Sequence, residues 1–398
     1  MSETVSEVTH QGFFSRLMES IKGVLFGLLL FVVAFPCLFW NETRAVNDWQ
    51  TLQSGRGAVV SVDAESVDPD NEGRLVHLSG RATTDETLDD VQFGVSESVL
   101  KLSRDVEMFQ WKENQKKKKR KKLGGGEETV TEYSYEKVWS SSLIKSGSFK
   151  KASEHANPSS MAYSAESFTA KSVTVGGFDL SAGLIGQISA WEDLEITSDT
   201  LAAAPDGIRG RLQVADGGYY IGADPSTPAI GDMRVSFEVV RPTVVTVVAG
   251  QDNNMLDSWE SPLGTGSLSM LEVGSLESDE MFEAAESRSV ALTWGLRIGG
   301  FFAMFMGITM ILRPFTVVGD IIPFVGSFLR LGAGILGCFM ASILSLGTIA
   351  LGWLFARPIL GAVLCSMTIL LFVGLVVLAV TLGRSRLKAA QDAAATPA

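Results

Sequence analysis

Few side chains in this sequence have the types and spacing that enzyme chemistry requires. His77 lies in a strand-like run and His155 lies in a loop that reads His-Ala-Asn-Pro-Ser-Ser; either could act as a base beside a serine. Such a loop also uses these side chains for turn hydrogen bonds, and we interpret both histidines as structural. The sequence contains no P-loop, GxSxG elbow, HExxH or dinucleotide fingerprint. We therefore expect no enzyme activity, no catalytic residue, no metal site and no cofactor.

The three cysteines, Cys37, Cys338 and Cys365, all lie in apolar runs. The polar middle of the chain consequently has no thiol with which to form a disulfide or a zinc site. We expect that part of the chain to fold on its hydrophobic core alone.

Arg297 is the only charged residue inside the apolar runs of this sequence. It lies within the apolar run Val290–Leu312, which is long enough to cross a membrane only if Arg297 is counted inside it, since a span needs about 20 residues. A charge at that depth either finds a partner or extends toward the headgroups. The other apolar runs contain no acid, but Glu42 lies two residues beyond the run that ends at Trp40, on the same face. We predict a Glu42–Arg297 ion pair; the alternative is that Arg297 lies among lipid phosphates.

Two apolar runs carry small residues at four-residue spacing. Helices in lipid associate through close backbone approach at such residues. The first stripe is Gly295, Gly299, Ala303 and Gly307, and the second is Ala333, Gly337, Ala341 and Ser345. We predict that each stripe occupies one helical face and that the two stripes pack against each other.

The elements that must position these residues are four apolar runs. Val290–Leu312 is one, and the others are 23–40, 331–356 and 358–382. The last two contain no charged residue and are separated by Arg357 and a turn at Pro358, which predicts a tight antiparallel pair. No small-x-small cleavage site follows the first run, so we interpret it as a retained anchor.

The short loops indicate how these spans are oriented. With four crossings, seven basic residues fall on one side and only Arg357 falls on the other. The seven are Arg16, Lys22, Arg313, Arg330, Arg384, Arg386 and Lys388. By the positive-inside rule, tails 1–22 and 383–398 and loop 313–330 are expected to be cytosolic, and the domain 41–289 is expected to lie outside the cytosol, in a periplasm or a lumen.

Composition excludes one class of partner. The 398 residues are 46% hydrophobic and carry a net charge of −12, and subtracting the seven basic residues Lys116–Lys122 leaves −19. Such a balance does not favour nucleic-acid binding. We expect membrane lipids, other membrane proteins and further copies of this chain as partners.

The domain 41–289 is expected to be β-rich. Runs with alternating or β-branched residues predict strands, among them Val106–Trp111 and Tyr133–Trp139, which would form a hairpin. The basic run Lys116–Lys122 and Gly124–Gly126 would form its tip, either as a solvated loop with few contacts or as a contact to anionic headgroups. Phe178–Ile188 is expected to form a short helix.

Several blocks resemble the transmembrane protein 43 (LUMA) family in the same order along the chain. They are Asn41–Glu42, Asn71–His77, Lys101–Met108, His155–Ser159, Glu166–Thr169, Gly231–Phe237 and Thr293–Arg297. The resemblance covers nearly all of the chain between Asn41 and Pro358. It implies a four-span protein of the endoplasmic reticulum and inner nuclear membrane that scaffolds envelope complexes with emerin and lamins in animals, with similar proteins in bacteria.

These observations together predict an integral membrane protein with four transmembrane α-helices. A large β-rich α+β extracytosolic domain would be inserted between helices 1 and 2. The expected function is that of a multi-pass scaffold that organises membrane protein complexes; a membrane-tethered enzyme and a small-solute transporter are the alternatives. A bacterial cytoplasmic membrane is the favoured location, or the endoplasmic reticulum and inner nuclear membrane if the source is a eukaryote.

Overall fold

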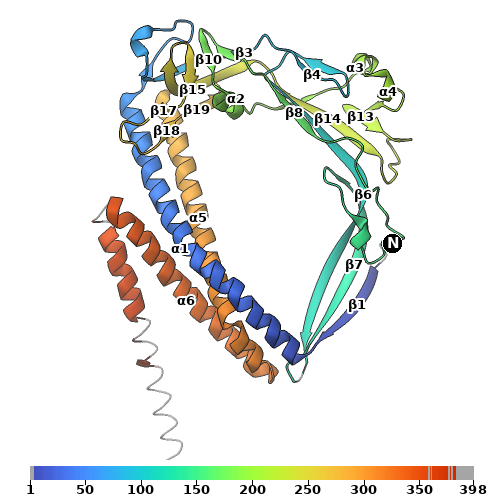
Figure 1. The fold of residues 1–398 in the computed structure, drawn as a ribbon, viewed down its shortest axis with the longest axis vertical. Helices are drawn as coiled ribbons and strands as arrows, with labels where there is room; N and C mark the ends of the chain where they lie inside the picture. The colour runs from blue at the N-terminus through green and yellow to red at the C-terminus, as the bar shows by residue number, and fades with distance from the viewer. Residues whose placement is uncertain are drawn as a thin grey trace, which may run out of the picture. The chain divides into compact units, whose positions relative to one another are not determined.

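The chain folds into two compact units, drawn in Figure 1 from a computed structural model. The structure describes residues 4–122, 124–356, 359, 361–374, 377 and 380–381. The β-rich unit consists of Met1–Val8, Gln50–Lys118 and Val130–Glu286. The helical unit consists of Thr9–Trp49, Lys119–Thr129 and Ser287–Ala398.

Among the described residues, Gly361–Gly374 forms an apolar helix, and six further α-helices comprise three long and three short ones. They are α1 (Phe13–Ala58), α2 (Ala182–Gln187), α3 (Ser198–Ala203), α4 (Asp206–Arg209), α5 (Ser278–Gly319) and α6 (Pro323–Ala356). Because α1 has 46 residues, it is about 69 Å long at about 1.5 Å per residue, far more than a bilayer requires.

The strands gather in two large sheets and two small ones. The eight-stranded sheet contains β1 (Thr4–Gln11), β6 (Lys101–Lys121), β7 (Glu127–Ser140), β8 (Glu166–Thr169), β11 (Glu192–Leu194), β12 (Gln213–Ala215), β13 (Gly218–Ile221) and β14 (Met233–Val240). The seven-stranded sheet contains β2 (Val60–Ser61), β3 (Leu75–Thr83), β9 (Thr174–Val175), β10 (Phe178–Leu180), β15 (Thr243–Asp252), β16 (Met255–Asp257) and β19 (Met270–Val273). The pairs β4 (Leu88–Asp90) with β5 (Val95–Glu97) and β17 (Trp259–Glu260) with β18 (Ser267–Leu268) form the small sheets.

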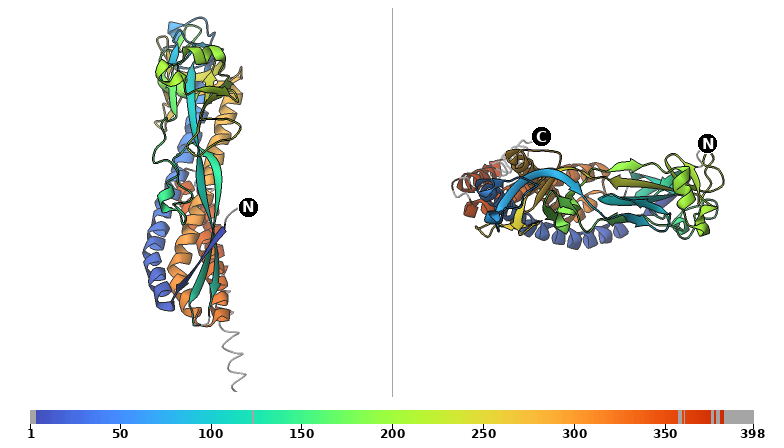
Figure 2. Two further views of the ribbon diagram at one scale, coloured as in Figure 1. Left: turned by 90° about the vertical axis from the view of Figure 1, so that its right-hand side faces the viewer. Right: turned by 90° about the horizontal axis from the view of Figure 1, so that it is seen from above.

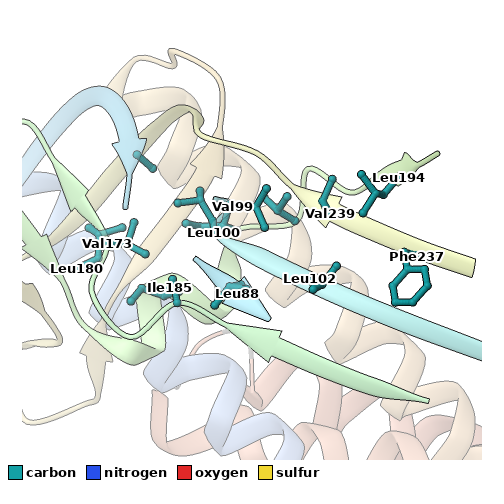
Figure 3. Close-up of a cluster of buried hydrophobic side chains, with 14 of the residues drawn as sticks. Leu88, Val99, Leu100, Leu102, Val173, Leu180, Ile185, Leu194, Phe237 and Val239 are labelled. Atoms are coloured by element: carbon teal, nitrogen blue, oxygen red, sulfur yellow. The ribbon is translucent and has the colours of Figure 1, made fainter. Parts of the chain in front are cut away.

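Alternation of side chains explains how the eight-stranded sheet covers a core. In β14, Met233, Val235, Phe237 and Val239 are buried, whereas the residues between them up to Glu238 are exposed. β14 pairs with β6 in antiparallel register, so that Val235 lies opposite Val106. The apolar residues of both strands therefore face the same side of the sheet. Leu102, Phe237 and Val239 belong to one buried cluster, part of which is drawn in Figure 3.

A hairpin was expected from Val106–Trp111 and Tyr133–Trp139, and the structure contains it. β6 and β7 are neighbours in the sheet, and both strands extend well beyond the expected limits. The expected helix at Phe178–Ile188 is only partly correct. Residues 178–180 form β10, which pairs in parallel with β16, and the helix α2 begins at Ala182. Pairing with a strand distant in the sequence outweighs the local helical pattern there.

One arginine is enclosed in the core of the β-rich unit. Arg104 has 1% of its surface exposed and donates to Asp90 Oδ2 at 2.5 Å and to Glu166 Oε2 at 2.9 Å. Asp90 is equally buried, whereas the Glu166 side chain is 55% exposed. The Phe93 ring lies 5.1 Å from the guanidinium carbon. Burial, with a smaller contribution from Asp90, raises the pKa of the nearby Tyr219 to about 12.

The helical unit contains the apolar helices. Among the described residues, three helices are long and apolar enough to cross a membrane, namely Phe13–Ala58, Ser278–Gly319 and Val325–Leu354. Figures 1 and 2 show α1, α5 and α6 packed side by side within this unit. Their shared core contains Ala34 and Leu38 of α1, Met304 of α5 and Ala341 of α6.

The fourth expected span, 358–382, lies partly outside the described residues, as does the turn at Arg357 and Pro358. Of this span, Gly361–Gly374 forms a shorter apolar helix. A Cβ atom at Gly361 would lie 2.5 Å from Leu354 Cα, and one at Gly347 would lie 3.5 Å from Thr368 Cγ2. The contacts run in opposite sequence directions, so this helix packs antiparallel to α6.

The Arg104 network generates the first prediction. Replacing Asp90 with asparagine should destabilise the protein by about 3–5 kcal/mol, because it leaves a buried guanidinium without its buried counter-charge. Equilibrium unfolding of the full chain in detergent, followed by tryptophan fluorescence, measures the change. Glu166→Gln is the matched control on the same arginine and should cost at most about 1 kcal/mol, since that partner is exposed. Equal losses for the two variants would contradict this account.

Candidate functional site

Glu42 is fully buried in the helical unit and is bound by two other helices. Its carboxylate accepts hydrogen bonds from Arg297 Nε at 2.8 Å and from Arg297 Nη2 at 2.6 Å. Trp353 Nε1 donates to Glu42 Oε2 at 2.7 Å. The acid is 0% exposed and the arginine side chain is 15% exposed. The structure thus brings together the two residues expected from the sequence and adds a third from α6.

Arg297 and Glu42 form a bidentate ion pair, in which two guanidinium nitrogens donate to the two carboxylate oxygens. An arginine that binds both oxygens of a carboxylate fixes orientation as well as distance. A charge without water is retained only when its partner and its remaining hydrogen bonds are in place. Glu42 meets both conditions, so it acts as the point at which α1, α5 and α6 are fastened together.

Gly352 makes room for Glu42. A Cβ atom at this position would lie 2.6 Å from Glu42 Cβ and 3.1 Å from Glu42 Cγ. Contacts that short require something to move, and the glutamate is held by its three hydrogen bonds. Gly352 and Trp353 are therefore both needed for α6 to reach the acid. The sequence contained a signal for the tryptophan, because it lies near the end of an apolar run where interfacial aromatic residues collect.

Further polar contacts join α1 to α5 beside this pair. Asn41, also fully buried, donates to the Thr293 carbonyl at 3.2 Å. Arg44 donates to Thr293 Oγ1 at 3.0 Å, and Ser289 donates to Asp48 Oδ2 at 2.8 Å. The blocks Asn41–Glu42 and Thr293–Arg297, far apart in the sequence, thus form one contact surface.

Three other blocks singled out in the sequence are also neighbours. Lys101–Met108 lies in β6, where Arg104–Met108 pairs with Met233–Phe237 of the block Gly231–Phe237 and Lys101–Arg104 pairs with the block Glu166–Thr169. They surround Arg104 and position its partner Glu166. These blocks therefore build a structural core.

A second buried acid, Asp320, lies just after the end of α5 and is 1% exposed. Arg16 Nη2 donates to its Oδ2 at 2.7 Å, Arg330 Nη2 donates to its Oδ1 at 3.2 Å, and Lys121 Nζ also donates to Oδ2. A Cβ atom at Gly326 would collide with Asp320, so that glycine is required. The sequence reasoning missed this residue. The available signal was that Asp320 is the only acid between Glu286 and Asp392.

The basic run is not the loop with few contacts that was expected. Lys119 lies 3.0 Å from Glu127 and Lys122 lies 2.5 Å from Glu128, both on the opposite strand. Lys121 contacts Asp320, and Arg16 donates to the Gly125 carbonyl. The hairpin tip, residues 119–129, is part of the helical unit.

This contact bears on membrane sidedness. Arg16 was expected to be cytosolic, and the basic run was expected to lie outside the cytosol with the rest of 41–289. Both expectations cannot hold for Lys121 and Arg16, which share the carboxylate of Asp320. Whichever side of the membrane holds Arg16 also holds the hairpin tip.

The two predicted stripes of small residues do not pack against each other. Among the described residues, no heavy atom apart from the adjacent residues and the nearby backbone of α5 lies within 4 Å of a Cβ placed at Gly295 or Gly299. Gly307 packs on the Gly27 carbonyl and Phe31 of α1, whereas Gly337 packs on Phe305, Ile308 and Thr309 of α5. A four-residue repeat advances about 40° beyond a full turn at each step, since a helix has 3.6 residues per turn. The stripe therefore winds around the helix instead of following one face.

The remaining small residues of the two stripes are buried or half-buried in the helical unit. Ala303 is half-buried beside the shared helix core, and Ala333 is half-buried on α6. Ala341 and Ser345 are buried in the helical unit. The α5 face that meets α1 instead uses Gly300, Met304 and Gly307, which keep the helical period; a Cβ at Gly300 would lie 2.4 Å from Leu38 Cδ2.

The two histidines have structural surroundings. His77 bonds Ser61 Oγ at 3.1 Å and the Leu276 carbonyl at 3.0 Å. The His155 ring stacks on Tyr135 with 3.8 Å between centroids and meets the edge of Trp111 at 4.6 Å. Among the described residues, no group of three or more His, Cys, Asp or Glu side chains could hold a metal ion.

A double-mutant cycle tests the junction at Glu42. Glu42→Gln and Arg297→Gln should each cost about 3–5 kcal/mol, and the double variant should cost clearly less than their sum, because each single change leaves a buried charge unpaired. Equilibrium unfolding in detergent gives the three values. Glu19→Gln, an exposed acid on the same helix, should change stability by at most about 0.5 kcal/mol. Additive losses would show that the two side chains act independently.

A labelling experiment tests the position of the hairpin tip. In a chain whose three cysteines are replaced by serine, single cysteines at Ser15 and Arg120, both exposed, should react with a membrane-impermeant maleimide from the same face. The contacts of Arg16 and Lys121 with Asp320 require this result. Ser160→Cys reports the face of the β-rich unit. Reaction of Arg120→Cys only from the face opposite to Ser15→Cys would refute the contact.

Comparison with known proteins agrees with the membrane helices. The model of the family TMEM43, described as Transmembrane protein 43, matches residues 108–358. The chain is 35% identical to Transmembrane protein 43 of Rattus norvegicus over 89% of each chain. It is 33% identical to that of Homo sapiens over 97% of this chain and 95% of the other, and 29% identical to the Drosophila melanogaster homolog over 88% and 94%. No solved structure matches the chain. The chain is therefore a member of the transmembrane protein 43 family.

Proposed function

We propose that this protein is a multi-pass membrane scaffold, in which membrane helices hold a β-rich unit that binds other membrane proteins. The observation that carries the proposal is the continuity of α1 and α5. Each helix passes from the helical unit into the β-rich unit without a break, α1 between Trp49 and Gln50 and α5 between Glu286 and Ser287. The membrane helices and the β-rich unit are thus joined by continuous helical backbone, with no loop between them.

Packing at the far ends of these helices supports the same proposal. Leu52 of α1 and Met281 and Phe282 of α5 are buried in one cluster with Leu75 and Val248 of the seven-stranded sheet. A Cβ at Gly55 would lie 2.2 Å from Leu268 Cδ1, so α1 approaches β18 closely. The ends of both apolar helices are thus built into the core of the β-rich unit.

The use of the buried charges also supports a scaffold. Glu42, Asp320 and Arg104 are each bound by oppositely charged side chains of this chain. A carboxylate that serves an ion path or a catalytic step has to exchange partners during the cycle. These three groups instead connect elements distant in the sequence, which is a structural use.

We further propose four membrane crossings, with both termini facing the cytosol. The basic residues Arg16, Lys22, Arg313 and Arg330 favour this orientation by the positive-inside rule. Four crossings would place the β-rich unit on the face opposite Arg16, whereas the tip 119–129 shares Asp320 with Arg16. The labelling of Arg120→Cys and Ser160→Cys tests this arrangement. A bacterial cytoplasmic membrane, or the endoplasmic reticulum and inner nuclear membrane of a eukaryote, is the proposed location, and the protein would assemble as a homo-oligomer.

Crosslinking tests the scaffold role. The tagged full chain is crosslinked in membranes of the source organism, extracted at increasing detergent strength and recovered for mass spectrometry. We expect the same few membrane proteins in constant proportion to the chain at each strength. Asp90→Asn, which weakens the β-rich unit and leaves the apolar helices unchanged, should lose them, whereas the matched variant Glu166→Gln should keep them.

Two outcomes would refute the scaffold proposal. One is recovery of the chain alone in the mildest detergent. The other is solute flux across proteoliposomes that contain the purified chain and stops in the Arg297→Gln variant, since that result would assign the charged junction to transport.

A further inference from the structure

A basic surface surrounds Asp320 in the helical unit. It is formed by six cations: Arg16, Lys119, Arg120, Lys121, Lys122 and Arg330. The acids among them are Asp320, Glu127 and Glu128. Six cations against three acids leave an excess of three positive charges, in a chain whose net charge is −12. The excess is therefore local and opposite in sign to the rest of the protein.

The carboxylates at this surface are already shared. Asp320 alone accepts from Arg16, Lys121 and Arg330, and Glu127 lies 3.0 Å from Lys119 and 3.9 Å from Arg16. One acid cannot neutralise three cations. Lys119 and Lys122 keep 61% and 51% of their side-chain surface exposed despite their ion pairs. The surface has capacity for a further anion.

Large apolar side chains are exposed around the same end of the unit. Phe14 is 79% exposed, Phe315 is 70% exposed, Ile322 is 60% exposed and Phe328 is 64% exposed. They lie at the start of α1, near the end of α5, between α5 and α6 and on the first turns of α6. Basic residues combined with exposed aromatic and aliphatic residues are typical of a surface that rests in the headgroup region of a bilayer.

The position of the basic surface relative to the membrane helices indicates which anion it binds. The apolar run of α5 ends at Leu312 and that of α6 begins at Leu331, so Asp320 and Arg330 lie where two membrane helices emerge. The anion present at that level in every bilayer is the phosphate of the lipid headgroup. Anionic leaflets attract juxtamembrane basic residues with a strength equivalent to about fivefold in affinity per residue.

We propose that this basic surface, including the tip of the β6–β7 hairpin, binds the headgroups of anionic phospholipids. The tip supplies Lys119, Arg120 and Lys122, while Asp320 holds Lys121 and Arg16 in place beneath them. The hairpin is thereby a membrane-surface anchor for a strand pair whose other end belongs to the β-rich unit. The inference does not depend on the scaffold role.

Spin-labelled lipids measure this selectivity directly. The full chain is reconstituted in phosphatidylcholine bilayers that contain trace spin-labelled phosphatidylglycerol or spin-labelled phosphatidylcholine, and electron paramagnetic resonance gives the fraction of each lipid held at the protein. We expect the wild-type chain to prefer phosphatidylglycerol and to lose that preference as salt is raised. The triple variant Lys119→Gln, Arg120→Gln, Lys122→Gln should lose most of the preference.

Matched controls make the result decisive. Lys137→Gln, Lys145→Gln, Lys171→Gln removes three exposed lysines from the β-rich unit and should keep the preference. Arg120 forms no ion pair with any residue that the structure describes, so Arg120→Gln alone should leave the fold undisturbed. It should reduce the preference for phosphatidylglycerol by about fivefold at most. Thermal unfolding confirms that each variant is folded.

Three results would overturn the proposal. The wild-type chain could hold both lipids equally, or the tip variant could retain its preference, or the control triple could lose as much. Suppression of the preference by millimolar inorganic phosphate at constant ionic strength would assign the surface to a free phosphate ligand. An acidic protein bound at the tip in phosphatidylcholine alone, and lost in the tip variant, would assign it to a protein partner.

Discussion

A single carboxylate without access to water organises the membrane helices of this protein. Glu42 is charged, fully buried and located where α1 leaves its apolar segment, and it is held by three hydrogen bonds from two other helices. Removing water from a carboxylate costs several kcal/mol even after relaxation, and only well-oriented partners offset that cost. The relative positions of α1, α5 and α6 are thus constrained by this polar requirement in addition to the close helix packing at Gly300 and Gly307, since hydrophobic burial gives membrane helices no driving force to associate.

The two buried acids of the helical unit are compensated in different ways. Glu42 is bound by one arginine and one neutral tryptophan, so the junction is electrically balanced and closed by Gly352. Asp320 receives three cations and leaves positive charge at the surface. The first arrangement suits a fixed connection between helices. The second suits a boundary with an anionic environment, because its excess charge is neutralised only from outside.

Sequence patterns predicted those features that depend on local composition or on the cost of an isolated charge. Three of the four apolar runs lie in helices long and apolar enough to cross a membrane, and the fourth contains the shorter apolar helix Gly361–Gly374. The hairpin around the basic run is also present. The Glu42–Arg297 contact could be inferred because so few charges lie at that depth. The strands β10 and β16 could not be, since three-residue strands are stabilised by partners far away in the sequence. The prediction that the two stripes of small residues pack against each other was wrong, because a repeat of four residues does not match the helical period of 3.6. The role of Asp320 was not predicted, because its partners come from three separate segments of the chain.

The ribosome synthesises the hydrogen-bond partners of Glu42 long after Glu42 itself. Arg297 follows Glu42 by 255 residues and Trp353 follows it by 311. At about 5–20 residues per second, roughly 13 to 50 s separate the synthesis of Glu42 from that of Arg297. During this interval the first apolar segment carries an acid whose partner does not exist, so it has to wait where the carboxylate keeps its water. The helices therefore cannot complete their packing in the order of their synthesis. A chain whose synthesis stops before residue 297 keeps an unpaired carboxylate at the membrane surface, which the full-length chain does not have.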